Sequence, residues 1–203
     1  MKLREFFSFK HMDLELEPIE GDVLRREENW ENAMAYHQMR LPVEKITKHY
    51  ERILRKKVSS DHPFLDIHIA GEDELEHIAD VYNQAWTTAN TPFRRLDLET
   101  LIRLYNQYHY VFLIAKTDEE YCGFAILDYQ GDANEYGIIV GMGIIPKYQR
   151  KGFGTALGVA AWELFKEQEV REIRCEVYVN NKKSYDFISS LGFEEYDVKV
   201  YHN

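Results

Sequence analysis

Cysteine is scarce in this chain of 203 residues, which has two, Cys122 and Cys175, far apart in sequence. Such a pair makes neither the disulfide framework of a secreted scaffold nor the ligand spacing of a zinc site. We therefore expect two reduced core thiols in a cytoplasmic protein without a metal. The chain also lacks the apolar run of about 18 residues that a membrane helix needs, and its first residues lack the apolar stretch of a signal peptide. A membrane is therefore not an expected partner.

Long basic runs are absent as well. The net charge is -10, and the basic clusters at 55–57 and 150–151 are short. Because binding to nucleic-acid phosphates needs a concentrated positive face, nucleic acid is not an expected partner. An acidic surface favours a cationic partner such as an amine.

The composition that remains is typical of a globular protein, with 45% hydrophobic and 14% aromatic residues. Residues 1–62 differ in pattern from the rest. A charged segment predicts a helix over 22–40, and apolar residues at spacings of three and four predict a second helix over 43–57. A polar break near Pro63 then separates a helical N-terminal extension, residues 1–62, from a domain over residues 63–203.

From residue 64 onward, strands and helices alternate. Helices are expected over 72–86, 97–107, 153–168 and 184–191, and strands over 64–70, 110–116, 122–129, 136–145, 173–179 and 195–201. Short polar turns predict antiparallel pairs, whereas the helix over 153–168 requires a parallel crossover between its flanking strands. The sequence therefore predicts an α+β fold, with a mixed, mostly antiparallel central sheet flanked by helices.

One expected strand runs into a short basic loop that opens a helix, over residues 144–156. The first N–H groups of a helix have no acceptor within it, and the helix dipole is positive there, so the loop suits a pyrophosphate. Gly152 and Gly154 allow a close approach of the backbone to phosphates, and Arg150 and Lys151 add positive charge. The loop fits neither the P-loop pattern nor the dinucleotide pattern G-x-G-x-x-G.

The pattern that does fit is Gln-x-x-Gly-x-Gly, at Gln149, Gly152 and Gly154. It resembles the acetyl-CoA loop of the GNAT superfamily of N-acetyltransferases, and the preceding Ile144-x-Pro146 is similar to that family's strand end. Taken alone, this motif also fits an ordinary glycine-containing start of a helix.

A second segment makes the resemblance more specific. After the strand over 173–179, Asn181 is followed three positions later by Ser184, and Gly192-Phe193 closes the short helix. The GNAT family has the same residue types at this spacing. With both motifs in the family's order, the chain resembles a GNAT enzyme over about residues 64–203.

The resemblance implies acetyl-CoA as co-substrate, with its pantetheine arm in a gap where the strand before the loop splays from its neighbour. Gly141 and Gly143 suit a bulge or a close backbone approach there. Asn181 contacts the cofactor or, alternatively, only caps the short helix. The implied cofactor-binding residues are Ile144, Ile145, Gln149, Arg150, Lys151, Gly152, Phe153, Gly154, Thr155, Asn181 and Ser184.

The implied reaction is direct attack of a primary amine, from a small molecule or a peptide, on the thioester. The family's usual general acid is a Tyr four residues before Gly-Phe, and this position is Ile188 here. Tyr185 is our candidate substitute, and the alternative is a packing aromatic. Glu135, Tyr136 and Glu176 are candidates for the general base, or else ordinary surface and sheet residues.

The acceptor site is expected around the loop Thr87–Arg95, where Trp86, Phe93, Tyr105 and Tyr108 either line an apolar pocket or belong to the core. The missing acid leaves a noncatalytic acyl-CoA-binding regulatory module as an alternative function. An enzyme that uses succinyl- or propionyl-CoA is another alternative. Residues 1–62 could form a lid, a dimer arm or a packed cap, and a homodimer through an exposed strand edge stays open.

Overall fold

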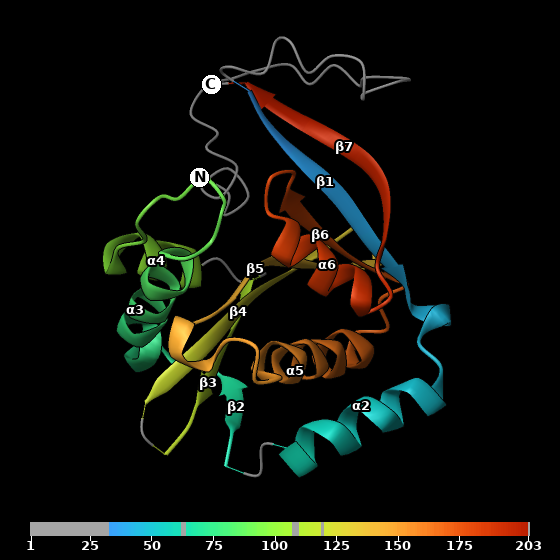
Figure 1. Cartoon of the computed structure of the whole chain (residues 1–203), viewed down its shortest axis with the longest axis horizontal. Coiled ribbons are helices and arrows are strands. Elements are labelled where there is room, and N and C mark those ends of the chain that lie inside the picture. The colour runs from blue at the N-terminus through green and yellow to red at the C-terminus, as the bar shows by residue number, and fades with distance from the viewer. Residues whose placement is uncertain (1–32, 62–63, 107–109, 119, 203) are drawn as a thin grey trace.

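The computed structural model describes residues 33–61, 64–106, 110–118 and 120–202. Its centre is a seven-stranded sheet in the order β2-β3-β4-β5-β6-β1-β7 (Figure 1). Among the described strands, β5 and β6 pair in parallel and the other neighbours are antiparallel. The strands are β1 (Ala33–Pro42), β2 (Asp66–Ile69), β3 (Tyr110–Lys116), β4 (Tyr121–Gln130), β5 (Tyr136–Ile144), β6 (Glu172–Tyr178) and β7 (Glu194–His202).

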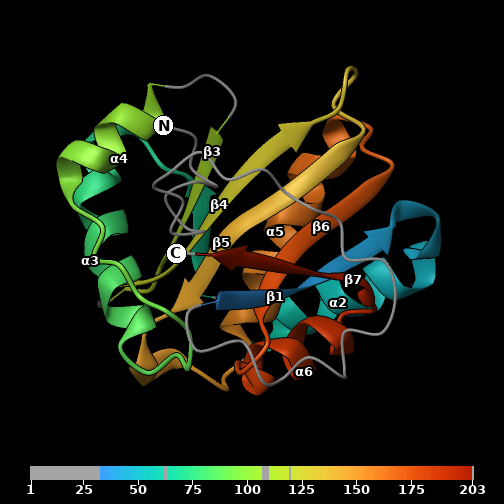
Figure 2. The ribbon, with the colours of Figure 1, turned by 90° about the horizontal axis from the view of Figure 1, so that it is seen from above.

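Helices cover both faces of this sheet (Figures 1 and 2). The pair α3 (Leu75–Trp86) and α4 (Leu98–Tyr105) lies on one face, and α5 (Phe153–Glu167) and α6 (Lys182–Ser190) lie on the other. The mixed α+β architecture expected from the sequence is confirmed. None of the described helices is long and apolar enough to cross a bilayer.

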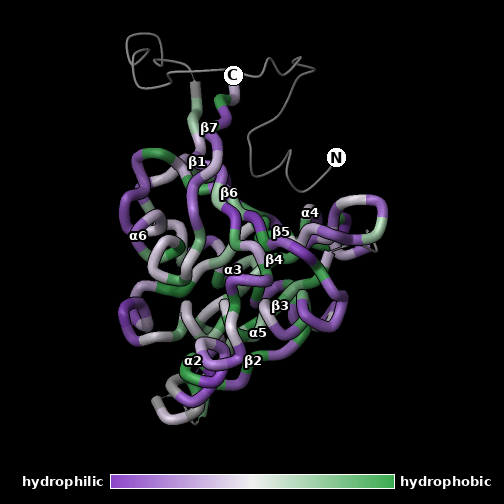
Figure 3. Tube along the Cα trace, turned by 90° about the vertical axis from the view of Figure 1, so that its right-hand side faces the viewer, coloured by the Kyte–Doolittle hydropathy of each residue, from purple (hydrophilic) through white to green (hydrophobic). Residues whose placement is uncertain are grey.

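The helices form where capping and apolar periodicity coincide. At the start of α4, Asp97 accepts a hydrogen bond from the backbone N of Thr100 at 2.7 Å, which confirms the expected N-cap. Leu101 and Leu104 then face the core with at most 2% exposure. Hydrophobic stretches run through the interior of the molecule and hydrophilic stretches through its outer turns (Figure 3), so burial of these apolar stripes holds the layers together.

The helix expected over 22–40 is wrong where the structure describes it, because residues 33–42 form the strand β1. The part over 22–32 lies outside the described residues. β1 lies between β6 and β7 and pairs antiparallel with both, and a register shift interrupts its pairing with β7 between Gln38 and Met39. Part of the N-terminal segment therefore belongs to the central sheet.

The second expected helix of this segment is confirmed as α2 (Lys48–Asp61), preceded by the short 3-10 turn Val43–Lys45. It lies against α5, on the side away from the sheet (Figure 1). Glu51 accepts hydrogen bonds from Lys166 at 3.0 Å and from Arg55 at 2.8 Å, and Arg55 also pairs with Glu163 of α5. Of the roles left open for the N-terminal segment, α2 fits the packed cap.

Candidate functional site

The site begins where two parallel strands part. β5 and β6 pair from Tyr136–Glu172 to Ile139–Cys175, and beyond these residues the pairing stops although both strands continue. The separation coincides with a bulge in β5, because Ile126 of β4 pairs with Gly141 while its neighbour Leu127 pairs with Ile139. A bulge increases the local twist and bends a strand away from its neighbour. The splayed strand expected from the family resemblance is therefore present.

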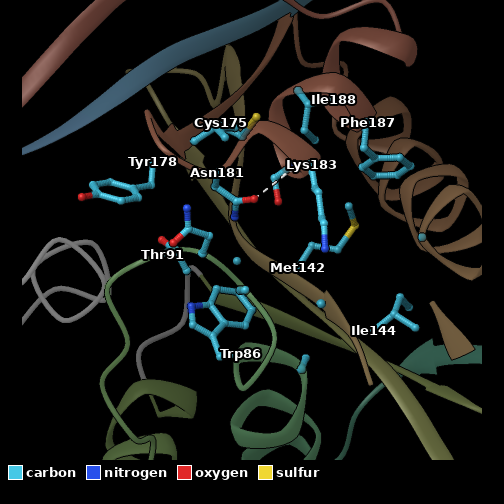
Figure 4. Close-up of a pocket in the computed structure, with 18 of the residues that line it drawn as sticks. Trp86, Thr91, Met142, Ile144, Cys175, Tyr178, Asn181, Lys183, Phe187 and Ile188 are labelled. Carbon is cyan, nitrogen blue, oxygen red and sulfur yellow. Dashed lines mark hydrogen bonds between the residues drawn. The ribbon is translucent and has the colours of Figure 1, made fainter. Parts of the chain in front are cut away.

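The gap between the two strands opens into a cavity of about 890 Å³. β5 lines it with Ile138 to Ile144 and β6 with Cys175 to Tyr178. Trp86 and Thr91 approach the cavity from the α3 side, and Phe187 and Ile188 approach it from α6 (Figure 4). In the described part of the chain, the edge of β5 beyond Ile139 has no strand partner on the β6 side, so its backbone groups can bind a ligand.

The loop at the end of β5 places an open helix start at this cavity. After the 3-10 turn Pro146–Tyr148, Arg150 and Gly152 take positive φ angles of 62° and 88°, and α5 begins at Phe153. No side chain caps α5 among the described residues. Because the first turn of a helix has N–H groups without internal acceptors and a positive dipole, this end favours an anion. Gly152, Gly154 and Thr155 line the cavity at this point.

Gln149 fixes the loop in place. Its side-chain amide donates to the carbonyl O of Ile144 at 2.9 Å and to Oγ1 of Thr88 at 3.3 Å. The amide therefore joins the end of β5 to the segment after α3. The motif glutamine is thus an organiser of the loop, whose own backbone remains available for a ligand.

Asn181 caps the short helix α6 and also lines the cavity. Its Oδ1 accepts a hydrogen bond from the backbone N of Ser184 at 3.2 Å, which the dashed line in Figure 4 marks. The capping role and the cofactor-facing position therefore occur together, since the cap uses the oxygen and leaves the amide nitrogen as a donor.

Eight of the eleven expected cofactor-binding residues line the cavity: Ile144, Gln149, Arg150, Gly152, Gly154, Thr155, Asn181 and Ser184. The other three have different positions. Ile145 is 3% exposed and its N–H donates to the carbonyl O of Cys122 at 3.0 Å, so it is engaged by the sheet. Phe153 is buried and its ring stacks on that of Tyr148, and the ammonium of Lys151 lies 5.3 Å from the centroid of the same Tyr148 ring.

Tyr185, the candidate general acid, lies outside the lining of the cavity. Its hydroxyl donates to Oε2 of Glu195 at 3.1 Å, and its ring lies 4.8 Å from that of His37. The hydrogen bond to Glu195 raises the pKa of Tyr185, and partial burial adds to this shift. The position thus fits the alternative of a packing aromatic on the β1–β7 side of α6.

Of the candidate bases, Glu176 lines the cavity. Tyr201 of β7 donates its hydroxyl to both carboxylate oxygens of Glu176, at 3.0 and 2.9 Å. Glu135 and Tyr136 lie at the opposite end of β5, where Glu135 accepts from the backbone N of Ala133.

Two other ionisable groups at the cavity stay protonated. Burial, aided by the charge of Glu176, raises the pKa of Tyr36 and that of the Cys175 thiol. Both residues line the cavity. A thiol held protonated is a weak nucleophile, so Cys175 is not suited to carry a covalent acyl intermediate. Both cysteines are free and buried, as expected.

The loop after α3 closes one side of the cavity. Asn90 donates to the carbonyl O of Asn180 at 2.8 Å, so the loop reaches the turn that precedes α6. Trp86 lines the cavity and stacks on Tyr82 at 4.8 Å, whereas Phe93 is 43% exposed and outside the lining. Tyr105 packs on Phe112 in the core, and Tyr108 lies outside the described residues.

The sequence did not single out Tyr36, Asn180 and Lys183 as residues of the site, and it indicated Thr88 and Asn90 only as members of the acceptor loop Thr87–Arg95. Tyr36 was missed because its strand had the pattern of a helix. The two loop contacts join segments 61 and 90 positions apart in sequence, so no local pattern indicates them. Lys183 occupies a variable place inside the second motif, and the structure directs it into the cavity (Figure 4).

Comparisons with known proteins agree with this geometry. An N-alpha-acetyltransferase of Sulfurisphaera tokodaii is 31% identical over 104 residues, which are 46% of this chain and 61% of that protein. The chain thus spans less than two thirds of that relative's length.

Solved structures show the same fold. The PaiA N-acetyltransferase from Thermoplasma acidophilum, in complex with coenzyme A, has a TM-score of 0.56 at 18% identity, covering 68% of this chain and 99% of that one. The aminoglycoside acetyltransferase meta-AAC0020 from an uncultured soil metagenomic sample, in complex with sisomicin, has a TM-score of 0.59 at 21% identity and covers 70% and 97%. The ribosomal-protein-S18-alanine N-acetyltransferase from Escherichia coli has a TM-score of 0.54 at 18% identity and covers 67% and 90%.

The family described as Acetyltransferase (GNAT) matches residues 75–193, which include the splayed strands, the loop before α5 and the whole of α6. The chain belongs to the GNAT family of acetyltransferases.

Proposed function

We propose that this chain transfers an acetyl group from acetyl-CoA to a primary amine by direct attack. The observation that carries the proposal is the parting of β5 from β6 beside the open start of α5. One end of the cavity thus offers N–H groups to a diphosphate, and its middle offers an unpaired strand edge to the pantetheine arm.

The residues at the helix start then have separate roles in holding the cofactor. The backbone at Gly152, Gly154 and Thr155 accepts the pyrophosphate, and Arg150 adds charge at the rim. Asn181 donates its amide nitrogen from the opposite wall. The donor set of backbone N–H groups, one guanidinium and one amide fits a phosphate-bearing ligand.

For the chemical step, the carboxylate of Glu176 receives the proton of the attacking ammonium, a role supported by its position in the lining of the cavity. The neutral amine then forms the bond to the thioester carbon, the C–S bond breaks, and coenzyme A leaves as thiolate. A backbone N–H of the unpaired β5 edge stabilises the oxyanion of the tetrahedral intermediate. Tyr201 positions the Glu176 carboxylate through its two hydrogen bonds.

The acceptor enters on the α3 side, between the loop Thr87–Arg95 and the tyrosines around Glu176. A carboxylate surrounded by aromatic rings suits a cationic amine. The related structures include an aminoglycoside acetyltransferase and a ribosomal-protein-alanine acetyltransferase, so the acceptor panel contains both small amines and peptide N-termini. With two free, buried thiols, we expect the protein to act in the reducing cytoplasm.

A thiol-release assay with acetyl-CoA tests the proposal, using polyamines, amino acids, aminoglycosides and peptide N-termini as acceptors. We expect release with at least one class of amine. Cofactor binding without release across the panel would contradict the proposal and favour the regulatory acyl-CoA-binding module.

The loop assignment has its own variant, Gly154→Glu. A Cβ at Gly154 lies 3.2 Å from Cζ of Phe187, and the added carboxylate lies at the helix start that binds the diphosphate. We expect acetyl-CoA affinity to fall at least 100-fold by calorimetry, since repulsion and lost N–H contacts of about 3 kcal/mol correspond to that factor. Gln168→Glu, at the exposed far end of α5, is the control with the same change of charge. Equal affinities in the two variants would overturn the loop assignment.

A further inference from the structure

A second, smaller cavity of about 60 Å³ lies behind the cofactor cavity, between α2, α5 and α6. Its lining is almost entirely apolar. The residues that line this cavity and not the cofactor cavity include Ile46, Tyr50, Leu54, Gly158, Val159, Trp162 and Leu191. We name it the α2 slot, because α2 and the turn before it supply its outer wall.

The α2 slot adjoins the cofactor cavity at one place. Ile139, Met142, Thr155 and Ile188 line both cavities. Ile139 is the last residue of β5 that pairs with β6, and Met142 lies on the unpaired edge beyond it, where the proposed function holds the oxyanion of the thioester. The slot therefore lies next to the part of the cofactor cavity where the thioester is expected, on the side away from the acceptor loop.

We propose that the α2 slot holds the tail of an acyl group longer than acetyl, so that this enzyme also takes a short straight-chain acyl-CoA such as butyryl-CoA and binds it more tightly than acetyl-CoA. This inference rests on the proposed function and deepens it by naming the acyl chain. The transfer itself is unchanged: the amine nitrogen bonds to the acyl carbon, the C–S bond breaks, and coenzyme A leaves as thiolate. The difference is that the longer acyl tail fills the apolar slot, which an acetyl group is too short to fill.

Ile188 is the residue of α6 that lies between the cofactor cavity and the slot. It lies on the cavity side of α6, is 6% exposed and lines both spaces. An isoleucine at this position presents only carbon to the acyl group, so no polar group is stripped of water when a tail passes it. With Met142, an adaptable side chain, it forms an apolar entrance.

The size of the slot limits the length of the tail. A group the size of a water molecule needs about 15 Å³ of cavity volume, so the slot, with about 60 Å³, accommodates roughly four groups of that size. Two to four carbons beyond the acetyl methyl therefore fit, and longer tails exceed the slot. Each methylene that becomes buried strengthens binding about fourfold.

The outer wall is held by charged contacts between α2 and α5. Glu51 and Arg55 pair with Lys166 and Glu163 on the α5 side. Glu51 keeps its charge, because the hydrogen bond from Lys166 outweighs partial burial and lowers the pKa of its carboxyl. The wall is therefore formed by a docked helix, and an acyl tail finds the slot preformed.

The test measures dissociation constants by calorimetry for acetyl-, butyryl-, hexanoyl- and decanoyl-CoA, which needs no knowledge of the acceptor. We expect butyryl-CoA to bind about 15-fold more tightly than acetyl-CoA, because two methylenes become buried. Decanoyl-CoA should lose this gain. Butyryl-CoA that binds no better than acetyl-CoA overturns the inference and leaves the proposed function standing. Failure of all four to bind overturns the proposed function itself.

Two variants, together with one matched control, locate the effect. Gly158 lines only the slot, and a Cβ there lies 3.7 Å from Cδ1 of Leu191, an ordinary contact. Gly158→Leu should fill the slot and bring the butyryl-to-acetyl ratio close to one, whereas Gly158→Ala, the matched control, should keep most of it. Both should bind acetyl-CoA as the unaltered protein does. Leu54→Ala, from the α2 wall, should instead let decanoyl-CoA keep part of the gain in affinity. Unchanged affinity ratios in both Gly158→Leu and Leu54→Ala would overturn the assignment to the slot.

Discussion

Gly143 of β5 should not tolerate even a methyl group, since the strand is pressed against α3 where it lines the cavity. A Cβ at this position lies 2.7 Å from Cε1 of Phe124, 2.9 Å from Cβ of Ala85 and 3.0 Å from Cζ3 of Trp86. Overpacking of this kind costs about 1–3 kcal/mol. For a chain of this size, about 2 kcal/mol lowers Tm by roughly 4–8 °C. Gly143→Ala should therefore lose stability by that amount in thermal unfolding followed by circular dichroism.

The same change has the opposite expected sign at Gly158. There a Cβ meets Leu191 at 3.7 Å, and the position lies within the helix α5. Replacement of a helical glycine by alanine stabilises a protein by about 0.5–1 kcal/mol. Gly158→Ala should thus raise Tm by about 1–4 °C. If the Gly143→Ala and Gly158→Ala variants had the same Tm and the same affinity for acetyl-CoA, the inferred close approach of β5 to α3 would be refuted.

Two further predictions concern ionisable groups. Glu176→Gln should lower kcat by about 100-fold or more and leave the acetyl-CoA dissociation constant unchanged; a normal kcat would remove Glu176 from the mechanism. His68 bonds Asp66 and Glu74 at 3.0 Å each, and although burial alone would lower its pKa, these two carboxylates raise it. A histidine with a raised pKa stabilises the fold fully below its unfolded pKa of about 6.5, and this stabilisation is lost as the pH rises through its folded pKa. His68→Gln should therefore lower Tm more at pH 5.5 than at pH 8.5. An equal loss of Tm at the two pH values would contradict this prediction.

The sequence predicts the domain after residue 64 well because its periodicities are local and strong. The loop before α5 shows why a motif places some residues and not others. Successive residues of an extended strand point to opposite sides, so Ile144 reaches the cavity while Ile145 is turned into the sheet. Phe153 is buried for a different reason, because its ring stacks on that of Tyr148 at the start of the helix.

The strand β1 could not be predicted from local pattern. Its residues Ala33 to Arg40 contain Ala, Met, Gln and Arg, which favour helices, and no β-branched residue. The irregularity at Gln38 and Met39 also interrupts the alternation that indicates a strand. Pairing with β6 and β7 on both sides overrides these preferences, and this contact depends on residues more than 130 positions away in sequence.

Tyr185 illustrates a limit of helical spacing. It lies three residues before Ile188, which predicts the same side of α6, yet a separation of three residues is offset by about 60° around the helix axis. In a narrow site this offset is decisive: Ile188 lines the cavity, and Tyr185 reaches Glu195 of β7 instead. The hypothesis that Tyr185 replaces the missing acid has no support from this geometry.

The absence of a phenol at position 188 nevertheless weighs little against catalysis. The reaction needs two proton transfers, one from the ammonium and one to the leaving thiolate, and they differ in free-energy cost. A thiol like that of coenzyme A has a pKa of about 8.5, so it leaves as thiolate near neutral pH without much need of an acid. An amine with a pKa of about 10.4 is neutral in only about one molecule in a thousand at pH 7.4, a deficit of about 4 kcal/mol. The demanding transfer is therefore removal of the ammonium proton. Glu176, the residue that we propose for this transfer, lines the cavity and accepts two hydrogen bonds from Tyr201. With an apolar residue at position 188, the enzyme lacks only an acid for the leaving thiolate, which is the smaller of the two catalytic contributions. The same residue keeps the wall between the cofactor cavity and the α2 slot apolar, whereas a tyrosine hydroxyl would make it polar.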